Sequence, residues 1–264
     1  MVDINKNNSS VPVVLIAGIF WSFGPYVVRN IDDAALVPWQ YLFTRGIVIF
    51  LLLNMYLFLE EGKEFYKNYF KVGISGLIGG IGLGTAMITF IWSITNTTAA
   101  ITLLCLAAMP FITALLGFLF LKEKISLTVW IAIVVAAAGI CIMAFDNSGK
   151  NSLPGLVFGL VSALGFSIFS VSLRWRKETP KFTTVAFAGL FCFIFSAVIL
   201  ISNDANFLSS GKNEALFATH GTLVCMGLIL YSIGSKNIPA ADLTLLSLTE
   251  VIGGIFWVWL PWMG

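Results

Sequence analysis

Long apolar runs alternate with short polar joins along the whole chain. Nine runs can be drawn: 11–28, 36–59, 72–94, 99–121, 126–145, 154–173, 182–202, 215–235 and 240–260. Each is close to the roughly 20 apolar residues that one helix needs to cross a bilayer. A strand of a membrane barrel would have about 10 residues with apolar and polar positions alternating, whereas these runs are apolar on every face. The pattern predicts an all-α polytopic membrane protein.

The composition indicates lipid rather than water as the solvent. Only 11% of the 264 residues are charged and 58% are hydrophobic, whereas a soluble domain has roughly 25% charged residues. So few charges cannot cover a water-facing surface. The basic residues flank the apolar runs, so they form no patch for nucleic acid. We therefore expect the lipid bilayer as a partner, and no nucleic acid.

The distribution of Lys and Arg over the joins predicts the orientation in the membrane. Eleven of the fifteen lie on the same side of the membrane as the N-terminus, three lie on the opposite side, and Arg45 lies within a run. Short cytoplasmic loops are enriched in Lys and Arg, so the N-terminus is predicted to be cytoplasmic. The first run lacks the cleavage pattern of a signal peptide and is expected to remain as a helix.

A short sequence recurs in the fourth and ninth runs. Residues 101–106 read ITLLCL and residues 243–248 read LTLLSL. An odd number of crossings separates the copies, so they should lie antiparallel. Chance recurrence in so apolar a chain is the alternative. If the copies are related, they predict an inverted repeat, in which the substrate site of a transporter lies where the halves meet.

Several motifs resemble the EamA-type members of the drug/metabolite transporter superfamily. They are Trp21-Ser22 with Gly24, Arg45, and the segment from Thr98 through Pro110 to Leu121-Lys122-Glu123. The resemblance implies two inverted five-helix halves, cytoplasmic termini, a bacterial plasma (inner) membrane and the movement of small metabolites or amino acids, often outward. We expect the halves at 1–145 and 146–264.

The chain also departs from that family pattern. Members commonly end the fourth helix of each half with Leu-Gly-Glu, but Lys122 replaces the Gly here and the second copy is absent. The sequence stops at Gly264, just after the ninth run, so nine spans are visible and the expected tenth is missing. We expect a chain that is truncated relative to a ten-helix parent.

Two ionisable residues lie well inside apolar runs, Arg45 and Glu250. A charge at the centre of the bilayer costs roughly 2.5–3.5 kcal/mol on insertion scales, so such residues usually face a cavity or a partner. Arg45 could anchor a carboxylate or phosphate through its planar fork. Glu250 could bind an amine or carry the coupled proton. The alternative is that both form structural pairs.

Further candidates for the site are sparse. Hydroxyls on the fourth and ninth runs could contact a substrate, although a bond back to a helix carbonyl is the commoner fate of such a group. Aromatic side chains could line an apolar cavity or simply pack, and a proline within the fourth run could act as a gate or as a static bend. The hydroxyl candidates are Thr102, Thr244 and Ser247, the aromatic candidates are Trp21, Tyr26 and Trp92, and the proline is Pro110.

Glycines recur at four-residue intervals in the third run, at Gly76, Gly80 and Gly84. Such a stripe lets another helix approach closely, and packing within the bundle is the favoured reading over a homodimer. His220, the single histidine, lies near the start of the eighth run, which is its outer end in the predicted topology, so an interfacial role is expected. The four cysteines share no motif spacing, so no metal or cofactor is predicted.

These observations predict a secondary transporter, an exporter of small polar metabolites such as amino acids, working by alternating access. An enzyme is disfavoured because the runs contain no cluster of catalytic groups. No Gly-rich phosphate loop is present, which excludes ATP as the energy source on this chain. The alternative function is a non-transporting membrane subunit or sensor.

One substitution tests the role of the carboxylate in the ninth run. Glu250→Gln removes the charge while nearly keeping the shape of the side chain, so we expect transport to be lost and folding to be retained. Flux is measured at equal membrane levels of the two proteins. Wild-type flux in the variant would contradict the prediction.

Overall fold

The computed structural model describes residues 4–123, 153–176 and 179–259, together with residues 127, 130, 131, 134, 135 and 138, with side chains described between residues 10 and 257. The described part is helical and contains no strand. Its elements are α1 (Ile4–Ser22), α2 (Gly24–Arg29), α3 (Pro38–Glu61), η1 (Gly62–Tyr66), α4 (Lys67–Lys71), α5 (Gly73–Asn96), α6 (Ala99–Leu106), α7 (Met109–Leu116), η2 (Gly117–Leu121), α9 (Leu153–Trp175), α10 (Lys181–Ser202), α11 (Gly211–Gly234), α12 (Ala240–Ser247) and α13 (Thr249–Trp259).

Eight segments of the described chain are long and apolar enough to cross a membrane. They are Ser10–Arg29, Pro38–Lys71, Gly73–Asn96, Ala99–Leu121, Leu153–Trp175, Lys181–Ser202, Gly211–Gly234 and Ala240–Trp257. Each contains or overlaps one of the predicted runs. The remaining run, 126–145, lies outside the described residues except for isolated positions. The all-helical architecture is confirmed, and a count of nine or ten spans stays a prediction.

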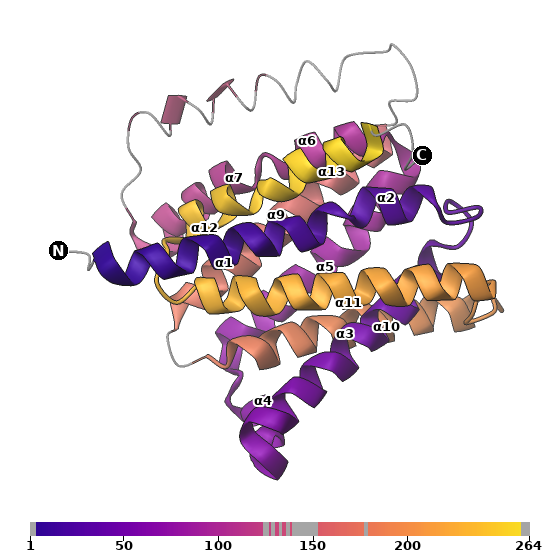
Figure 1. Cartoon of the computed structure of the whole chain (residues 1–264), viewed down its shortest axis with the longest axis horizontal. Helices are drawn as coiled ribbons and strands as arrows, with labels where there is room; N and C mark the ends of the chain where they lie inside the picture. The colour runs from indigo at the N-terminus through magenta and orange to yellow at the C-terminus, as the bar shows by residue number, and fades with distance from the viewer. Residues whose placement is uncertain are drawn as a thin grey trace.

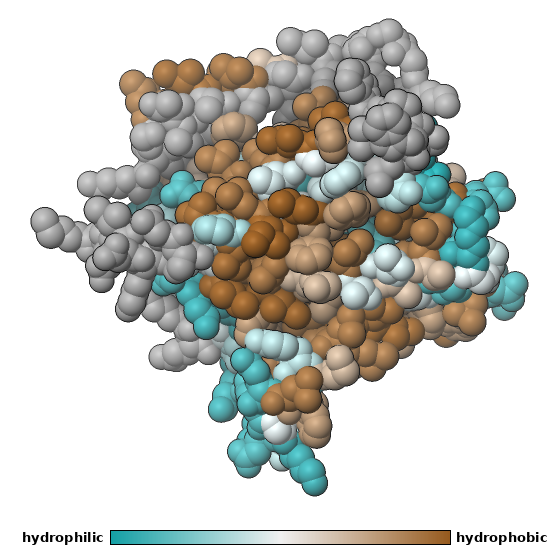
Figure 2. Space-filling view, viewed as in Figure 1, coloured by the Kyte–Doolittle hydropathy of each residue, from teal (hydrophilic) through white to brown (hydrophobic). Residues whose placement is uncertain are grey.

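The surface of the bundle has the distribution that a bilayer requires. Large apolar side chains such as Leu51, Ile78 and Ile201 are exposed on the outer faces of the helices. Figure 2 shows this apolar surface over the middle of the molecule, with hydrophilic residues gathered toward its edges and around α4. Lipid tails can cover the apolar surface, and water can cover the hydrophilic residues.

Close helix crossings hold the bundle together. Figure 1 shows the long helices side by side, and the main packed pairs are α5 with α9, α3 with α10 and α1 with α11. Gly82 meets Gly165 where α5 crosses α9: a Cβ atom at Gly82 would lie 2.9 Å from the Gly165 carbonyl oxygen. Gly46 of α3 meets Gly189 of α10 in the same way, at 3.0 Å.

The glycine stripe of α5 serves packing within the bundle, as predicted. A Cβ atom at Gly80 would lie 2.5 Å from the Phe187 ring, and one at Gly84 would lie 2.5 Å from the Phe191 ring, both on α10. Because glycine has no side chain, these aromatic rings pack directly against the α5 backbone. Close van der Waals contact of this kind drives helix association in lipid, where no hydrophobic effect acts between helices.

The fourth and ninth spans are each broken in the middle. α6 ends at Leu106 and α7 begins at Met109, while only Leu248 separates α12 from α13. Tighter i→i−3 hydrogen bonds mark both breaks: the Ala108 amide donates to the Cys105 carbonyl at 3.1 Å, and the Leu248 amide donates to the Leu245 carbonyl at 3.1 Å. In the alignment of the two short copies, α6 and α12 end one position apart.

The two broken helices pack antiparallel. α6 contacts α13 and α7 contacts α12 (Figure 1), so the first part of each span faces the second part of the other. Pro110 is the second residue of α7, where its missing amide costs nothing. The bend expected at Pro110 is therefore a two-residue break that precedes it.

Polar contacts join segments from before and after residue 146 at both ends of the bundle. At one end Arg174 lies 3.5 Å from the Glu123 carboxylate and donates to the Ile238 carbonyl at 2.5 Å. At the other end Lys212 pairs with Asp32 at 2.6 Å. These contacts join the two parts of the chain at each end of the bundle.

The crossing of α5 and α9 gives a test of the packing. In Gly165→Ala the new Cβ would lie 2.5 Å from the Gly82 carbonyl oxygen and 3.1 Å from the Ala86 amide. Overpacking of this kind costs about 1–3 kcal/mol, so the melting temperature in detergent should fall. Gly211→Ala is the control, because a Cβ there meets nothing within 4 Å. Equal melting temperatures for the two variants would contradict the packing account.

Candidate functional site

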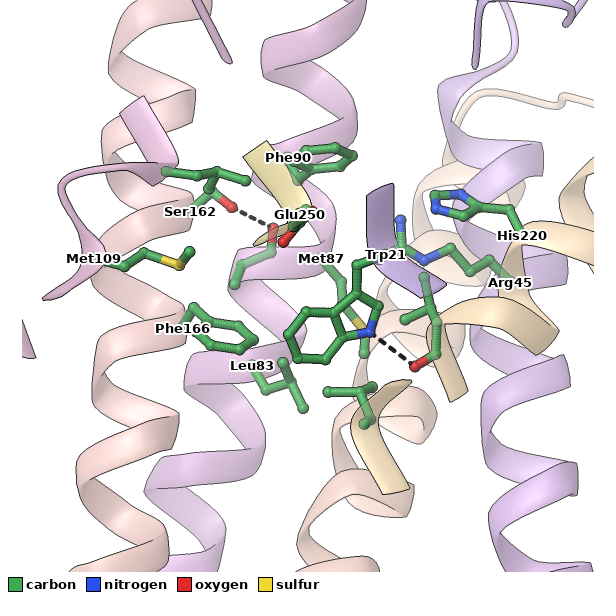
Figure 3. A pocket seen from close by; sticks show the side chains of 14 residues that line it. Trp21, Arg45, Leu83, Met87, Phe90, Met109, Ser162, Phe166, His220 and Glu250 are labelled. Carbon is green, nitrogen blue, oxygen red and sulfur yellow. Dashed lines mark hydrogen bonds between the residues drawn. The ribbon is translucent and has the colours of Figure 1, made fainter. Parts of the chain in front are cut away.

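A cavity of about 70 Å³ lies between the helices, midway along α5 (Figure 3). Its walls are mainly apolar, and helices from both halves of the chain contribute to them. The polar groups that reach it are few and come from four helices. They are Arg45 of α3, Ser162 of α9, His220 of α11 and Glu250 of α13.

Arg45 places an enclosed positive charge at the cavity. The residue is only 4% exposed, and its Nε and Nη1 atoms have no hydrogen-bond partner. No carboxylate of the described chain lies within 4.0 Å of its guanidinium. Next to it, Gly46 brings α10 against α3, which keeps lipid away from the charge. The guanidinium therefore has unused donors that a ligand can take.

Glu250 supplies the negative charge of the same cavity. It is the second residue of α13 and lies just after the break at Leu248. A carboxylate is stabilised in the first turn of a helix, where backbone amides are unpaired. The side chain is partly exposed, and no hydrogen bond to the described residues engages it. Arg45 acts on it electrostatically without forming a direct pair. The two charges thus face one space.

His220 also lines this cavity, which corrects the interfacial position expected from the sequence. The residue is 2% exposed, and its Nδ1 atom shares a hydrogen bond with the Tyr41 hydroxyl. The position of His220 was predicted wrongly because α11 begins earlier than the apolar run indicated. The helix starts at Gly211 rather than at residue 215, so His220 lies about 14 Å along it instead of about 8 Å, at 1.5 Å per residue.

Trp21 forms an aromatic wall of the cavity, and its role in binding stays a prediction. Its indole Nε1 donates to the Val224 carbonyl at 3.2 Å. The ring packs on Phe166 and Tyr231, with centroids 5.5 and 5.4 Å away. Gly227 of α11 has no side chain where the indole lies, and a Cβ atom there would collide with it. The ring is therefore held in one orientation.

The other predicted residues lie outside the cavity. The Thr102 hydroxyl bonds to the Ser93 hydroxyl at 2.8 Å, while Thr244 donates back to the Ala241 carbonyl at 2.9 Å. Ser247 donates back to the Thr244 carbonyl at 2.7 Å. Trp92 packs on Trp39 with centroids 5.3 Å apart. Tyr26 does not line the cavity either. A role of these five residues in binding stays a prediction.

The arrangement of charges in the cavity is suited to holding a charged solute. Ser162 is the one hydroxyl of the wall, and it donates to the Ala86 carbonyl at 3.0 Å. No group of three or more His, Cys, Asp or Glu residues that could hold a metal ion occurs within the described ranges. What the cavity offers is one cation, one carboxylate and one imidazole inside apolar walls.

Three bacterial proteins, two of them named as transporters, are similar to this chain over most of its length. An uncharacterized transporter of Helicobacter pylori (strain ATCC 700392 / 26695) is 25% identical over 255 residues, which cover 93% of this chain and 84% of the relative. The uncharacterized transporter YojE of Bacillus subtilis (strain 168) is 26% identical over 245 residues, covering 89% and 79%. Protein RarD of Escherichia coli (strain K12) is 22% identical over 172 residues, covering 62% and 55%.

Two further comparisons concern the fold and the family. A protein of known crystal structure superposes with a TM-score of 0.72 at 17% identity, over 94% of this chain and 86% of that one, which shows a shared fold. The profile of the EamA-like transporter family matches residues 8–145, just over half of the 264 residues. The chain therefore belongs to the EamA-like transporter family of the drug/metabolite transporter superfamily.

Proposed function

We propose that the chain is a secondary transporter that moves a small polar metabolite, such as an amino acid, by alternating access between two inverted halves. The position of the helix breaks carries the proposal. Leu106 at the end of α6, Met109 at the start of α7 and Glu250 at the start of α13 all line the cavity. In many transporters the substrate site lies where discontinuous helices meet near the middle of the membrane.

The helix contacts support the inverted relation of the proposed halves, 1–145 and 146–264. If α1, α3, α5 and α6–α7 correspond to α9, α10, α11 and α12–α13, each contact should have a counterpart. The α5–α9 contact corresponds to α11–α1, the α5–α10 contact to α11–α3, and the α6–α13 contact to α12–α7. All six of these contacts occur, which supports a two-fold relation between the proposed halves.

The charges of the cavity support a small zwitterion as the substrate. A guanidinium fork pairs with a carboxylate in two places, and Glu250 offers a partner for an ammonium group. Because the cavity measures about 70 Å³, it is far smaller than the roughly 300–1,000 Å³ of drug-sized sites. A zwitterion that bridges Arg45 and Glu250 would supply an oppositely charged partner to both residues at once.

The basic residues support a cytoplasmic N-terminus. Arg174 and Lys181 lie at the bundle end that also carries Ser10 and Asn237, which bond to each other at 3.1 Å. The opposite end carries Lys212. The asymmetry favours the first end as cytoplasmic. The relatives named above are bacterial, so we propose the plasma (inner) membrane of a bacterium as the location and export as the direction.

A non-transporting membrane subunit or sensor is the alternative. Such a protein could bind the same solute at Arg45 and Glu250 without carrying it across the membrane. The two functions differ in whether the solute crosses the membrane, not in how tightly the protein binds it.

Release of metabolites from cells separates these functions. We compare cells that express the wild type, Glu250→Gln and Asp242→Asn at matched membrane levels. Asp242 is the control because it lies on α12, eight residues before Glu250, and is exposed. A metabolite enriched in the medium with the wild type and Asp242→Asn, but not with Glu250→Gln, supports transport through the cavity. Identical media for all three folded proteins would favour the subunit or sensor.

The metabolite found in this way tests the role of the guanidinium. Arg45→Lys keeps the positive charge but loses the fork, so we expect the KM for that metabolite to rise about tenfold, equivalent to about 1.4 kcal/mol. Arg176→Lys is the matched control, because Arg176 is exposed. Initial rates in membrane vesicles give the KM. An unchanged KM in Arg45→Lys would remove Arg45 from the binding site.

A further inference from the structure

We propose that His220 and Arg45 together form an anion subsite that binds the carboxylate of the substrate, with the His220 Nε2–H group donating into the cavity and Tyr41 holding the ring in that tautomer. The inference rests on the proposed function, because it specifies how one end of the transported solute is held. It gives a role in binding to Tyr41, which the sequence did not single out, and to His220, for which the sequence predicted an interfacial role.

Close approach of α11 to α3 places the two donors side by side. A Cβ atom at Gly221 would lie 3.1 Å from the Val48 side chain and 3.4 Å from the Arg45 Cα atom. The preceding residue, His220, lines the same cavity as Arg45 and lies close enough for the two side chains to interact electrostatically. Figure 3 shows the imidazole and the guanidinium together on one side of the cavity, with Glu250 on the other side beyond Trp21.

Tyr41 lies on the same face of α3 as Arg45, one turn earlier. Its side chain is fully enclosed at 1% exposure, and its ring stacks on Phe217 with centroids 4.7 Å apart. The hydroxyl and His220 Nδ1 are hydrogen-bonded. Phe217 packs on the ring of Tyr41 and holds that ring in place. The Tyr41 hydroxyl in turn fixes the rotation of the imidazole through their hydrogen bond.

The hydrogen-bond inventory determines which group donates. Arg45 can only donate, and it lies close enough to the Tyr41 hydroxyl to act on it electrostatically. If Nδ1 carried the proton, the Tyr41 hydroxyl hydrogen would have no acceptor among the described residues, and a buried unmatched donor is costly. The hydroxyl therefore donates to Nδ1, and the ring proton lies on Nε2.

The Nε2 atom is free to reach a ligand. No hydrogen bond of the described chain engages it, although the residue is almost completely enclosed. Gly24 of α2 lies close to it: a Cβ atom at Gly24 would lie 3.0 Å from Nε2, so a larger residue there would crowd the ring nitrogen. Because His220 lines the cavity, a ligand there that accepts a hydrogen bond can use this donor together with the unpaired Nε and Nη1 atoms of Arg45.

Charge and size select a monocarboxylate for this subsite. Arg45 and His220 present adjacent donors, which suits the two oxygens of one carboxylate. A dianion such as phosphate would bring a second negative charge toward Glu250 in a space of about 70 Å³. Like charges in such an enclosed site repel strongly. A free carboxylic acid and an amino acid share the carboxylate that the subsite recognises.

Propionate and propionamide test the subsite with the purified full chain in detergent. They have nearly the same shape and differ in charge. We measure their dissociation constants from ligand-dependent thermal stabilisation. The wild type should bind propionate more tightly than propionamide. Glu250→Gln should tighten propionate further, because it removes a negative charge from the same cavity.

Two substitutions of His220 separate its ring nitrogens. The amide of Gln reaches about as far as Nε2, whereas the amide of Asn reaches about as far as Nδ1. His220→Gln should therefore keep the preference for propionate, and His220→Asn should weaken propionate about tenfold, the effect of one hydrogen bond to a charged group. Equal affinities for propionate and propionamide in the wild type, or an unchanged propionate affinity in His220→Asn, would overturn the inference.

The tautomer can be read directly, since His220 is the single histidine of the chain. In ¹⁵N-histidine-labelled protein, the Nε2 resonance should show an attached proton and Nδ1 should not, and propionate should shift Nε2. Tyr41→Phe should remove this preference for one tautomer and raise the dissociation constant for propionate about threefold. A proton on Nδ1 alone would overturn the assignment whatever the affinities.

These measurements do not depend on flux, so the two proposals can fail separately. Propionate binding that requires His220, in a protein that releases no metabolite, would retain the subsite and reject the transporter. Release that requires Glu250, with propionate binding that ignores His220, would retain the transporter and reject the subsite.

Discussion

A guanidinium enclosed within a lipid-embedded bundle is the constraint around which the site is built. Burying such a charge at the centre of a bilayer costs roughly 2.5–3.5 kcal/mol even on the mildest scales. Arg45 has two nitrogen atoms without partners in this conformation. The surrounding groups reduce that cost only in part, through the carboxylate across the cavity and the neighbouring phenol. An enclosed charge left partly unsatisfied is a reason for the protein to keep an anion nearby.

Backbone proximity determines which side chains reach that charge. In lipid the helices gain nothing from burying apolar surface against one another, so they associate where small residues allow close contact. Gly46 brings α10 against α3, and Gly221 brings α11 against α3. These crossings bring His220 next to Arg45 and exclude lipid from both. The glycines thus determine the electrostatics of the cavity, although none of them carries a polar group.

The sequence predicted the spans better than it predicted the rotation of each helix about its axis. Run length identified the apolar helices because bilayer thickness sets that length. Arg45 and Glu250 stood out because charges are rare in lipid, and they do share one cavity. Trp92 and Tyr26 were chosen on the same ground as Trp21, their aromatic character. A run that is apolar on every face does not show which face points inward. His220 was placed wrongly because the polar first turn of α11 concealed where the helix begins.

The ion pairs at the two ends of the bundle differ in how much water reaches them. The side chains of Lys212 and Asp32 are each 59% exposed, whereas those of Arg174 and Glu123 are 29% and 32% exposed. Dissolved ions weaken the attraction within an exposed ion pair, and they weaken a sheltered pair much less. Ionic strength therefore acts unequally on the two ends. A rise in salt weakens the Lys212–Asp32 pair more than the Arg174–Glu123 pair, and the neutral hydrogen bonds of Asn213 to the Asp32 backbone then carry more of the contact at that end.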